Sequence, residues 1–156
     1  CPDVYGDPAL LLPRYFNPPK SGTCRLGVIP HMVDKNHPWI ESIAKEEGVK
    51  VIDIEADIET FVKDVLSCEC ILSSSLHGLI CADAYEIPNR RIVLSDQIQG
   101  ADFKFLDYYG AASVVPQTPI KPKVLESALQ IIPAIDRIAP LPDLDALLAV
   151  CPFKRA

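Results

Sequence analysis

Short apolar runs alternate along this chain with segments that have the apolar spacing of a helix. The runs are Leu26–Ile29, Lys50–Ile54, Cys70–Leu72 and Arg91–Leu94. Between them, Pro38–Glu47, Ile58–Leu66 and Leu76–Ala84 carry apolar residues at helical spacing, and Gly48 follows the first as a natural stop. Strands that alternate with helices in this way are joined by right-handed crossovers. The alternation therefore predicts an α/β fold with a parallel sheet flanked by helices.

Proline-rich stretches flank this pattern. Residues 1–24 are expected to be a leading segment or linker, in which Pro13 ends any regular element around Leu10–Leu12. Since the chain begins at Cys1 without an initiator Met, we expect a piece of a longer protein. The remaining predicted elements are helices at Phe103–Tyr109, Lys123–Ile132 and Leu144–Val150 and a short strand at Ala112–Val115.

Composition narrows the classes of partner. The formal net charge of −6 and the scattered basic residues argue against a nucleic-acid binder, which needs a basic face. No apolar run is long enough to span a bilayer.

The six cysteines point to a reduced compartment. Cys70 and Cys81 lie within apolar strand and helix patterns, where a free thiol packs as a small hydrophobe. Cys68 and Cys70 are too close in sequence for the usual zinc spacing, and no second pair accompanies them. We therefore expect no metal site, and a cytoplasmic location.

The expected ligand site lies where the strands end. In open parallel sheets, ligands bind outside the carboxyl ends of the strands. His31 follows the first strand, Ser73–His77 follow the third, and Asp96–Gly100 follow the fourth. The third strand runs through three serines straight into a helix, whose unpaired N–H groups suit an anion. A histidine beside an anion can also carry a proton near neutral pH.

These residues resemble the polysaccharide pyruvyl transferases, in their bacterial exopolysaccharide branch. The similarity covers roughly residues 4–115 and is most specific in a serine-rich block with the alanine-tyrosine-proline block that follows it. The matching blocks are Gly6–Arg14, Gly27–His31, Ser73–Ile80, Ala84–Pro88 and Phe103–Tyr109.

The resemblance implies a Rossmann-like donor-binding domain over residues 25–132, followed by a C-terminal proline-rich segment and helix over 133–156. It resembles the C-terminal half of a GT-B-like enzyme that moves pyruvyl from phosphoenolpyruvate onto two hydroxyls of a polysaccharide sugar, forming a cyclic ketal. Phosphoenolpyruvate is then the donor substrate, and no cofactor is needed. The acceptor sugar would lie largely against the missing N-terminal half, in an enzyme that can work peripherally at the inner membrane and as a homo-oligomer.

The resemblance also assigns site residues. His77 and His31 are the catalytic candidates, and the donor-binding candidates are Ser73, Ser74, Ser75, Gly78, Arg14 and Lys104. Other members carry arginine where this chain has Ser75, so the positive charge must come from elsewhere. The candidates for that charge are Arg14, Arg25, Lys35 and Lys104.

Two other functions fit the same residues. A nucleotide-sugar glycosyltransferase half-domain of similar fold would bind a diphosphate at the same edge. A non-catalytic domain that binds a sugar or a partner is consistent with the missing arginine.

Overall fold

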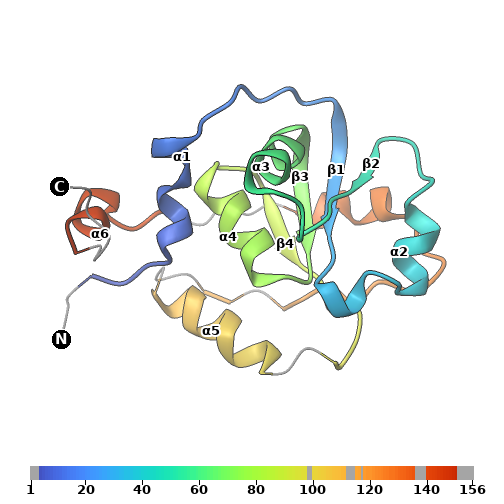
Figure 1. Ribbon diagram of the computed structural model, residues 1–156. Helices are drawn as coiled ribbons and strands as arrows, with labels where there is room; N and C mark the ends of the chain where they lie inside the picture. The colour runs from blue at the N-terminus through green and yellow to red at the C-terminus, as the bar shows by residue number, and fades with distance from the viewer. Residues whose placement is uncertain (1–3, 98–99, 112–114, 117, 136–139, 151–156) are drawn as a thin grey trace.

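A computed structural model describes residues 4–97, 100–111, 115–116, 118–135 and 140–150. Its centre is a four-stranded, fully parallel sheet in the order β2-β1-β3-β4. The strands are β1 (Cys24–Ile29), β2 (Val49–Val51), β3 (Cys68–Ser73) and β4 (Asn89–Arg91). The predicted parallel α/β sheet is thereby confirmed (Figure 1).

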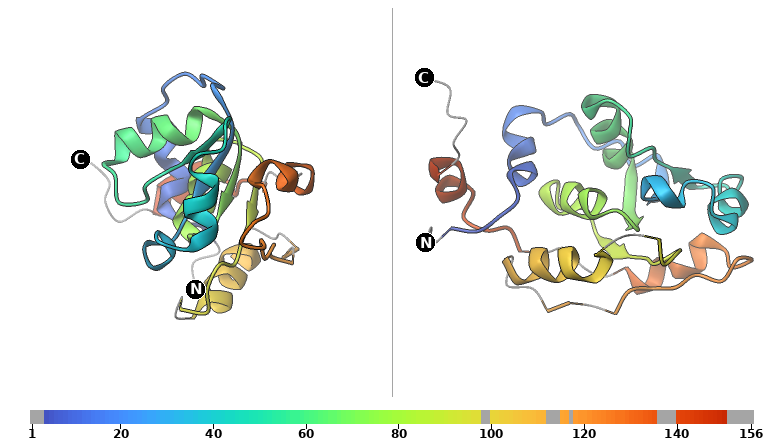
Figure 2. Two further views of the ribbon diagram at one scale, coloured as in Figure 1. Left: turned by 90° about the vertical axis from the view of Figure 1, so that its right-hand side faces the viewer. Right: turned by 60° about the horizontal axis from the view of Figure 1, so that its bottom comes forward.

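Helices cover both faces of the sheet (Figure 2). The α-helices are α1 (Leu12–Tyr15), α2 (Pro38–Ile43), α3 (Ile58–Leu66), α4 (Leu76–Ala84), α5 (Ala101–Ala111) and α6 (Leu144–Val150). Three 3-10 helices join them: η1 (Pro8–Leu11), η2 (Met32–Asp34) and η3 (Ala128–Ala134). None of the helices among the described residues has the length and apolar character needed to cross a membrane.

Alternate residues of the strands feed two separate cores. Leu26, Val28 and Leu72 pack with Trp39 of α2 and with η3 on one face. On the other face, Ile29 and Ile71 pack with η1, α3, α4, α5 and α6. If the pairing register of a strand shifted by one residue, each of its side chains would move to the opposite face of the sheet. The sequence pattern therefore sets the register.

Most element bounds follow the sequence pattern closely. The helices predicted at Ile58–Leu66 and Leu76–Ala84 have those bounds, and α2 ends before Gly48, which turns the chain at φ +83°. The fourth strand begins and ends earlier than the predicted Arg91–Leu94, because it pairs with β3 over Asn89–Arg91, and Ile92 beyond it forms an isolated bridge with Ile120. The strand predicted at Ala112–Val115 lies mostly outside the described residues.

Two expectations at the ends of the sheet domain were wrong. Pro13 does not end the regular structure around Leu10–Leu12; it occupies the first turn of α1, where its missing N–H costs no hydrogen bond. The helix predicted at Lys123–Ile132 is instead the short η3, whose start is held by the Glu46 carboxylate through the Ser127 hydroxyl and the Ala128 N–H.

Four of the cysteines lie among the described residues, and all four are free thiols: Cys24, Cys68, Cys70 and Cys81. Burial raises the pKa of Cys68 and Cys70 to about 11 and that of Cys81 to about 12. These three thiols stay protonated near neutral pH and act as packing residues rather than nucleophiles.

Candidate functional site

The order of the strands creates a topological switch point between β1 and β3. From β1 the chain moves to β2 on one side and then returns to β3 on the other, so the connections diverge between these two strands. Ligands of open α/β sheets bind at such a point, outside the carboxyl ends of the strands. His31 follows β1, and Ser73–His77 lead from β3 into α4, so the predicted residues lie on the two sides of this switch point.

The serine turn is built around the buried hydroxyl of Ser73. Its Oγ lies 2.9 Å from the Ile29 carbonyl oxygen and 2.8 Å from that of Ser75, and it accepts the Ser75 N–H at 3.0 Å. Gly78 lets the first turn of α4 approach this hydroxyl, since a Cβ at Gly78 would lie 2.4 Å from Ser73 Oγ. Ser73 and Gly78 thus shape this turn, and the donor-binding role expected of them stays a prediction.

Ser74 belongs to a second, buried network centred on Asp34. The Ser74 hydroxyl donates to Asp34 Oδ2 at 2.7 Å and accepts the His31 N–H at 2.9 Å. Ser95, which follows β4, donates its hydroxyl to Asp34 Oδ1 at 2.5 Å. Asp34 is only 1% exposed. Its carboxyl group therefore ties together the loops that follow three neighbouring strands.

The start of α4 lacks a side-chain cap. Ser75 occupies the N-cap position, but its side chain makes no capping hydrogen bond. The first N–H groups of a helix have no partner within the helix and lie at the positive end of its dipole. His77 is exposed in this first turn, beside an apolar hollow of about 220 Å³ that is also lined by Leu12, Ile58 and Cys81.

His31 faces a positive environment. Its pKa is lowered from the ordinary value of 6.5 by burial and by the positive charge of Lys104, with a smaller lowering from His77; Asp34 opposes them. The Nδ1 of His31 accepts the Val33 N–H at 3.3 Å, so the neutral ring carries its proton on Nε2. These effects place Lys104 and His77 within electrostatic range of His31.

The structure separates the four cations that were candidates to replace the missing arginine. Arg14 pairs with Asp145 of α6 at 2.7 Å, and Figure 1 shows α1 and α6 together, well away from η2. Lys35 is held by two carboxylates, those of Asp53 and Glu55, each at 2.5 Å.

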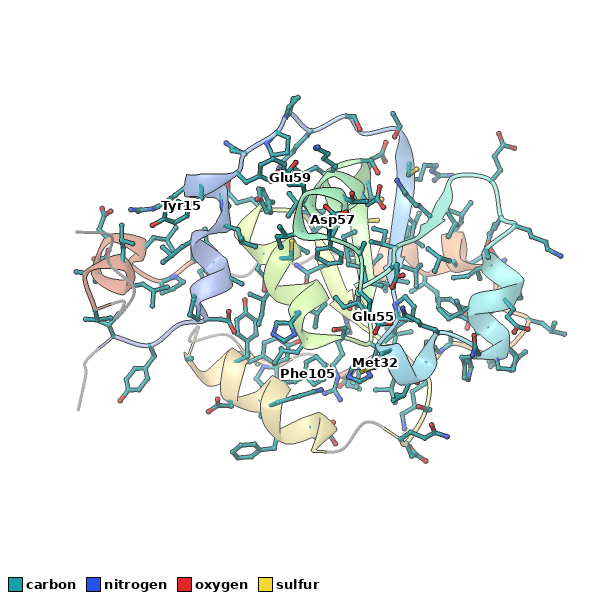
Figure 3. The ribbon with its side chains drawn as sticks, viewed as in Figure 1. Tyr15, Met32, Glu55, Asp57, Glu59 and Phe105 are labelled. Atoms are coloured by element: carbon teal, nitrogen blue, oxygen red, sulfur yellow. The ribbon has the colours of Figure 1, made fainter. Side chains whose placement is uncertain are left out.

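Of the four candidates, Lys104 remains at this edge. Arg25 lies at the start of β1, against Gly48, and therefore at the opposite edge of the sheet. Lys104, on α5, has no ion-pair partner among the described residues and lies 5.6 Å from the centre of the Phe105 ring. Figure 3 shows Phe105 between α5 and the lower end of α4, near Met32 of η2.

The sequence interpretation missed Asp34 and Ser95. Each stands in a polar stretch just after a strand, which was the available signal, but neither belongs to a motif. Their role depends on contacts between residues 40 and 61 positions apart in the chain.

Replacing Asp34 with alanine should lower the free energy of unfolding by about 2 kcal/mol, because the Ser74 and Ser95 hydroxyls lose their acceptor. Asp107→Ala, at an exposed position of α5, is the matched control and should cost far less. Urea unfolding of both variants measures the difference. Equal costs for the two would show that the Asp34 network contributes nothing to stability.

Comparison with known proteins shows the family of this chain. A sequence model of the polysaccharide pyruvyl transferase family matches residues 2–96, which include His31, the serine turn and His77. The chain is 37% identical over 110 residues to "Uncharacterized protein L143" of Acanthamoeba polyphaga mimivirus, a match that covers 66% of this chain but only 38% of that protein. No solved structure matches the chain. Since the family match covers more than half of its length, this chain belongs to the polysaccharide pyruvyl transferase family.

Proposed function

We propose that this chain forms the donor-binding domain of a transferase that moves pyruvyl from phosphoenolpyruvate onto a polysaccharide sugar as a cyclic ketal. The observation that carries the proposal is the uncapped start of α4 at the switch point between β1 and β3, where His31 lies within electrostatic range of Lys104 and His77. Phosphoenolpyruvate carries a phosphate and a carboxylate, so its site needs aligned N–H donors and cations. Both are present at this edge.

The proposed reaction needs one group that delivers a proton. Protonation of the donor's methylene carbon turns it into a methyl group and leaves a cationic central carbon. A sugar hydroxyl attacks this carbon and loses its proton; the carbon–oxygen bond to phosphate then breaks, and a second hydroxyl closes the ring and also loses its proton. The products are the ketal and inorganic phosphate. His77 is the residue we assign to the proton transfer, since it is exposed in the first turn of α4, next to the proposed anion site.

His31 has a different proposed role. Its lowered pKa keeps the imidazole neutral at neutral pH, with Nε2 as a hydrogen-bond donor. A neutral ring can orient the donor or a sugar hydroxyl through a hydrogen bond. Because it carries no charge, it is not repelled by the Lys104 ammonium. The Ser73 and Ser74 hydroxyls are engaged within the protein, so we assign to these two residues the shaping of the turn rather than contact with the phosphate.

Binding of phosphoenolpyruvate should raise the pKa of His31. An anion beside the ring favours the protonated imidazole, which in the free protein is disfavoured by burial and by Lys104. By linkage, the affinity for the anion should weaken as the pH rises through the interval between the free and the bound pKa of His31. NMR titration of the imidazole resonances, with and without ligand, measures this shift.

Two controls sharpen the titration. The phosphate group of the donor itself titrates near pH 6, so sulfate, whose charge is constant in this range, should produce the same direction of shift. His37 provides a matched histidine, because its Nδ1 caps α2 by accepting the Trp39 N–H. Addition of the ligand should leave its resonances unchanged. An unchanged His31 at saturating phosphoenolpyruvate would refute the proposed site. Binding of uridine diphosphate in its place would favour the glycosyltransferase alternative.

A further inference from the structure

A second hollow, of about 910 Å³, lies along the outer side of β4. Its walls come from the end of β4, the loop that follows it, α5 and the segment around Pro119. The residues that matter here are Arg91, Ser95, Asp102, Phe103, Thr118 and Lys121. Neither the proton transfer nor the anion site described above uses this hollow.

Arg91 supplies a fixed donor on the wall of the hollow. It is 8% exposed, and its guanidinium is stacked over the Phe105 ring with 3.9 Å to the ring centre. One terminal nitrogen donates to Asp102 at 2.7 Å, while the Nε–H has no acceptor among the described residues. Asp102 is 81% exposed on its side chain. The pair therefore presents an accessible carboxylate acceptor, which the buried guanidinium of Arg91 holds in place.

The same hollow has an apolar wall that nothing among the described residues covers. Phe103 is 77% exposed and Leu106 is 52% exposed, both on α5. Ser95 and Thr118 line the other walls, and the Ser95 hydroxyl is bonded to Asp34. An apolar ring face beside paired donors and acceptors suits a ligand that combines a C–H face with several hydroxyls, as a pyranose does.

The hollow is joined to the anion site by hydrogen bonds. Ser95, on its wall, donates to Asp34, and Asp34 accepts from Ser74 of the serine turn. The Arg91 guanidinium and the Lys104 ammonium also share the Phe105 ring, at 3.9 Å and 5.6 Å from its centre. The buried carboxyl group of Asp34 would therefore connect a sugar-binding hollow to the serine turn that we assign to the donor.

We propose that this hollow binds a pyranose unit of the acceptor saccharide, with Phe103 against the sugar ring and the Arg91–Asp102 pair on its hydroxyls. The inference rests on the proposed function for the identity of the ligand as acceptor. It places part of the acceptor site on this chain, whereas the family resemblance led us to expect the acceptor largely against another part of the enzyme.

The test is the binding of methyl galactopyranoside and methyl glucopyranoside to the full chain, measured by saturation-transfer NMR titration. Replacing Phe103 with alanine should weaken the binding of at least one pyranoside by about tenfold. Phe103→Tyr, which keeps the ring, should retain binding. Tyr15→Ala is the matched control: Tyr15 is 73% exposed on α1, far from Phe105 in Figure 3, and its loss should have no effect.

The outcomes separate this inference from the proposed function. Pyranoside binding that is weakened by Phe103→Ala but not by Tyr15→Ala, together with unchanged phosphoenolpyruvate binding, supports both. Pyranoside binding with the same dependence but no phosphoenolpyruvate binding supports a saccharide site and removes the proposed donor. A wild-type chain that binds neither pyranoside, or a Phe103→Ala variant that binds as well as the wild type, overturns the inference.

Discussion

Replacing His77 with alanine should lower the rate of phosphoenolpyruvate-dependent ketal formation by about 10²–10⁴-fold, the usual contribution of a general acid or base. His77 is exposed in the first turn of α4, where no capping side chain competes for the helix N–H groups. The variant should keep its fold, since an exposed side chain contributes little to stability. Phosphate release in the presence of a sugar acceptor measures the rate, and calorimetric titration measures donor affinity.

The comparison variant for His77 is His37→Ala, because His37 is the histidine that caps α2. It removes an imidazole of the same size from a position with a structural role, so the transfer rate per folded molecule should stay near that of the wild type. His77→Gln should show whether a polar group alone restores donor binding without restoring the rate. If His77→Ala leaves both the donor affinity and the rate unchanged, our assignment of the proton transfer is wrong.

Substitution of Gly78, the residue after His77, should change the stability of the fold rather than the chemistry of transfer. Gly78→Ala should lower the free energy of unfolding by about 3 kcal/mol, at the upper end of the usual cost of overpacking. The added Cβ would lie 2.4 Å from Ser73 Oγ and 3.0 Å from a methyl carbon of Ile29. Both neighbours are fully buried, so neither can move aside cheaply.

Gly110 offers a matched control for Gly78, because it also lies in a helix and a Cβ there would meet nothing within 4 Å. Gly110→Ala should be neutral or stabilising by up to about 1 kcal/mol, as expected from helix propensity. Chemical denaturation of both variants measures the contrast. Combining Gly78→Ala with Ser73→Ala should recover part of the loss, since the closest contact is with the serine hydroxyl. Similar unfolding free energies for the two glycine variants would contradict the packing role.

Adjacent residues in one motif thus have separate roles, which the motif alone does not distinguish. The Ser-Leu-His-Gly block predicted an anion site and a family, and the family match confirmed the latter. In the structure, Ser73 and Gly78 are committed to the packing of α4 on β3, while His77 is left exposed. The bacterial branch and the GT-B-like two-domain arrangement stay predictions, as does the ketal itself.

The sequence by itself determined the features that depend on local periodicity and local turn chemistry. Apolar spacing defined α3 and α4 to the residue, and the alternation of short strands and helices specified a parallel α/β sheet. These features follow from which side chains must be buried along one strand or one helix, so a window of a few residues contains them. The bounds of β4 and η3 were less accurate because partners distant in sequence, Ile120 and Glu46, decide them.

Only the tertiary structure decided which polar groups meet. The strand order brings His31 to the serine turn, and the fold of α5 over the carboxyl edge selects Lys104 from four candidate cations. Asp34 gains its role from hydroxyls that are 40 and 61 positions away along the chain. Hydrogen bonds and ion pairs act over a few ångströms of space, whatever the separation in sequence. A pattern within one segment therefore shows that an edge is polar, and the packing of the segments decides what that edge can bind.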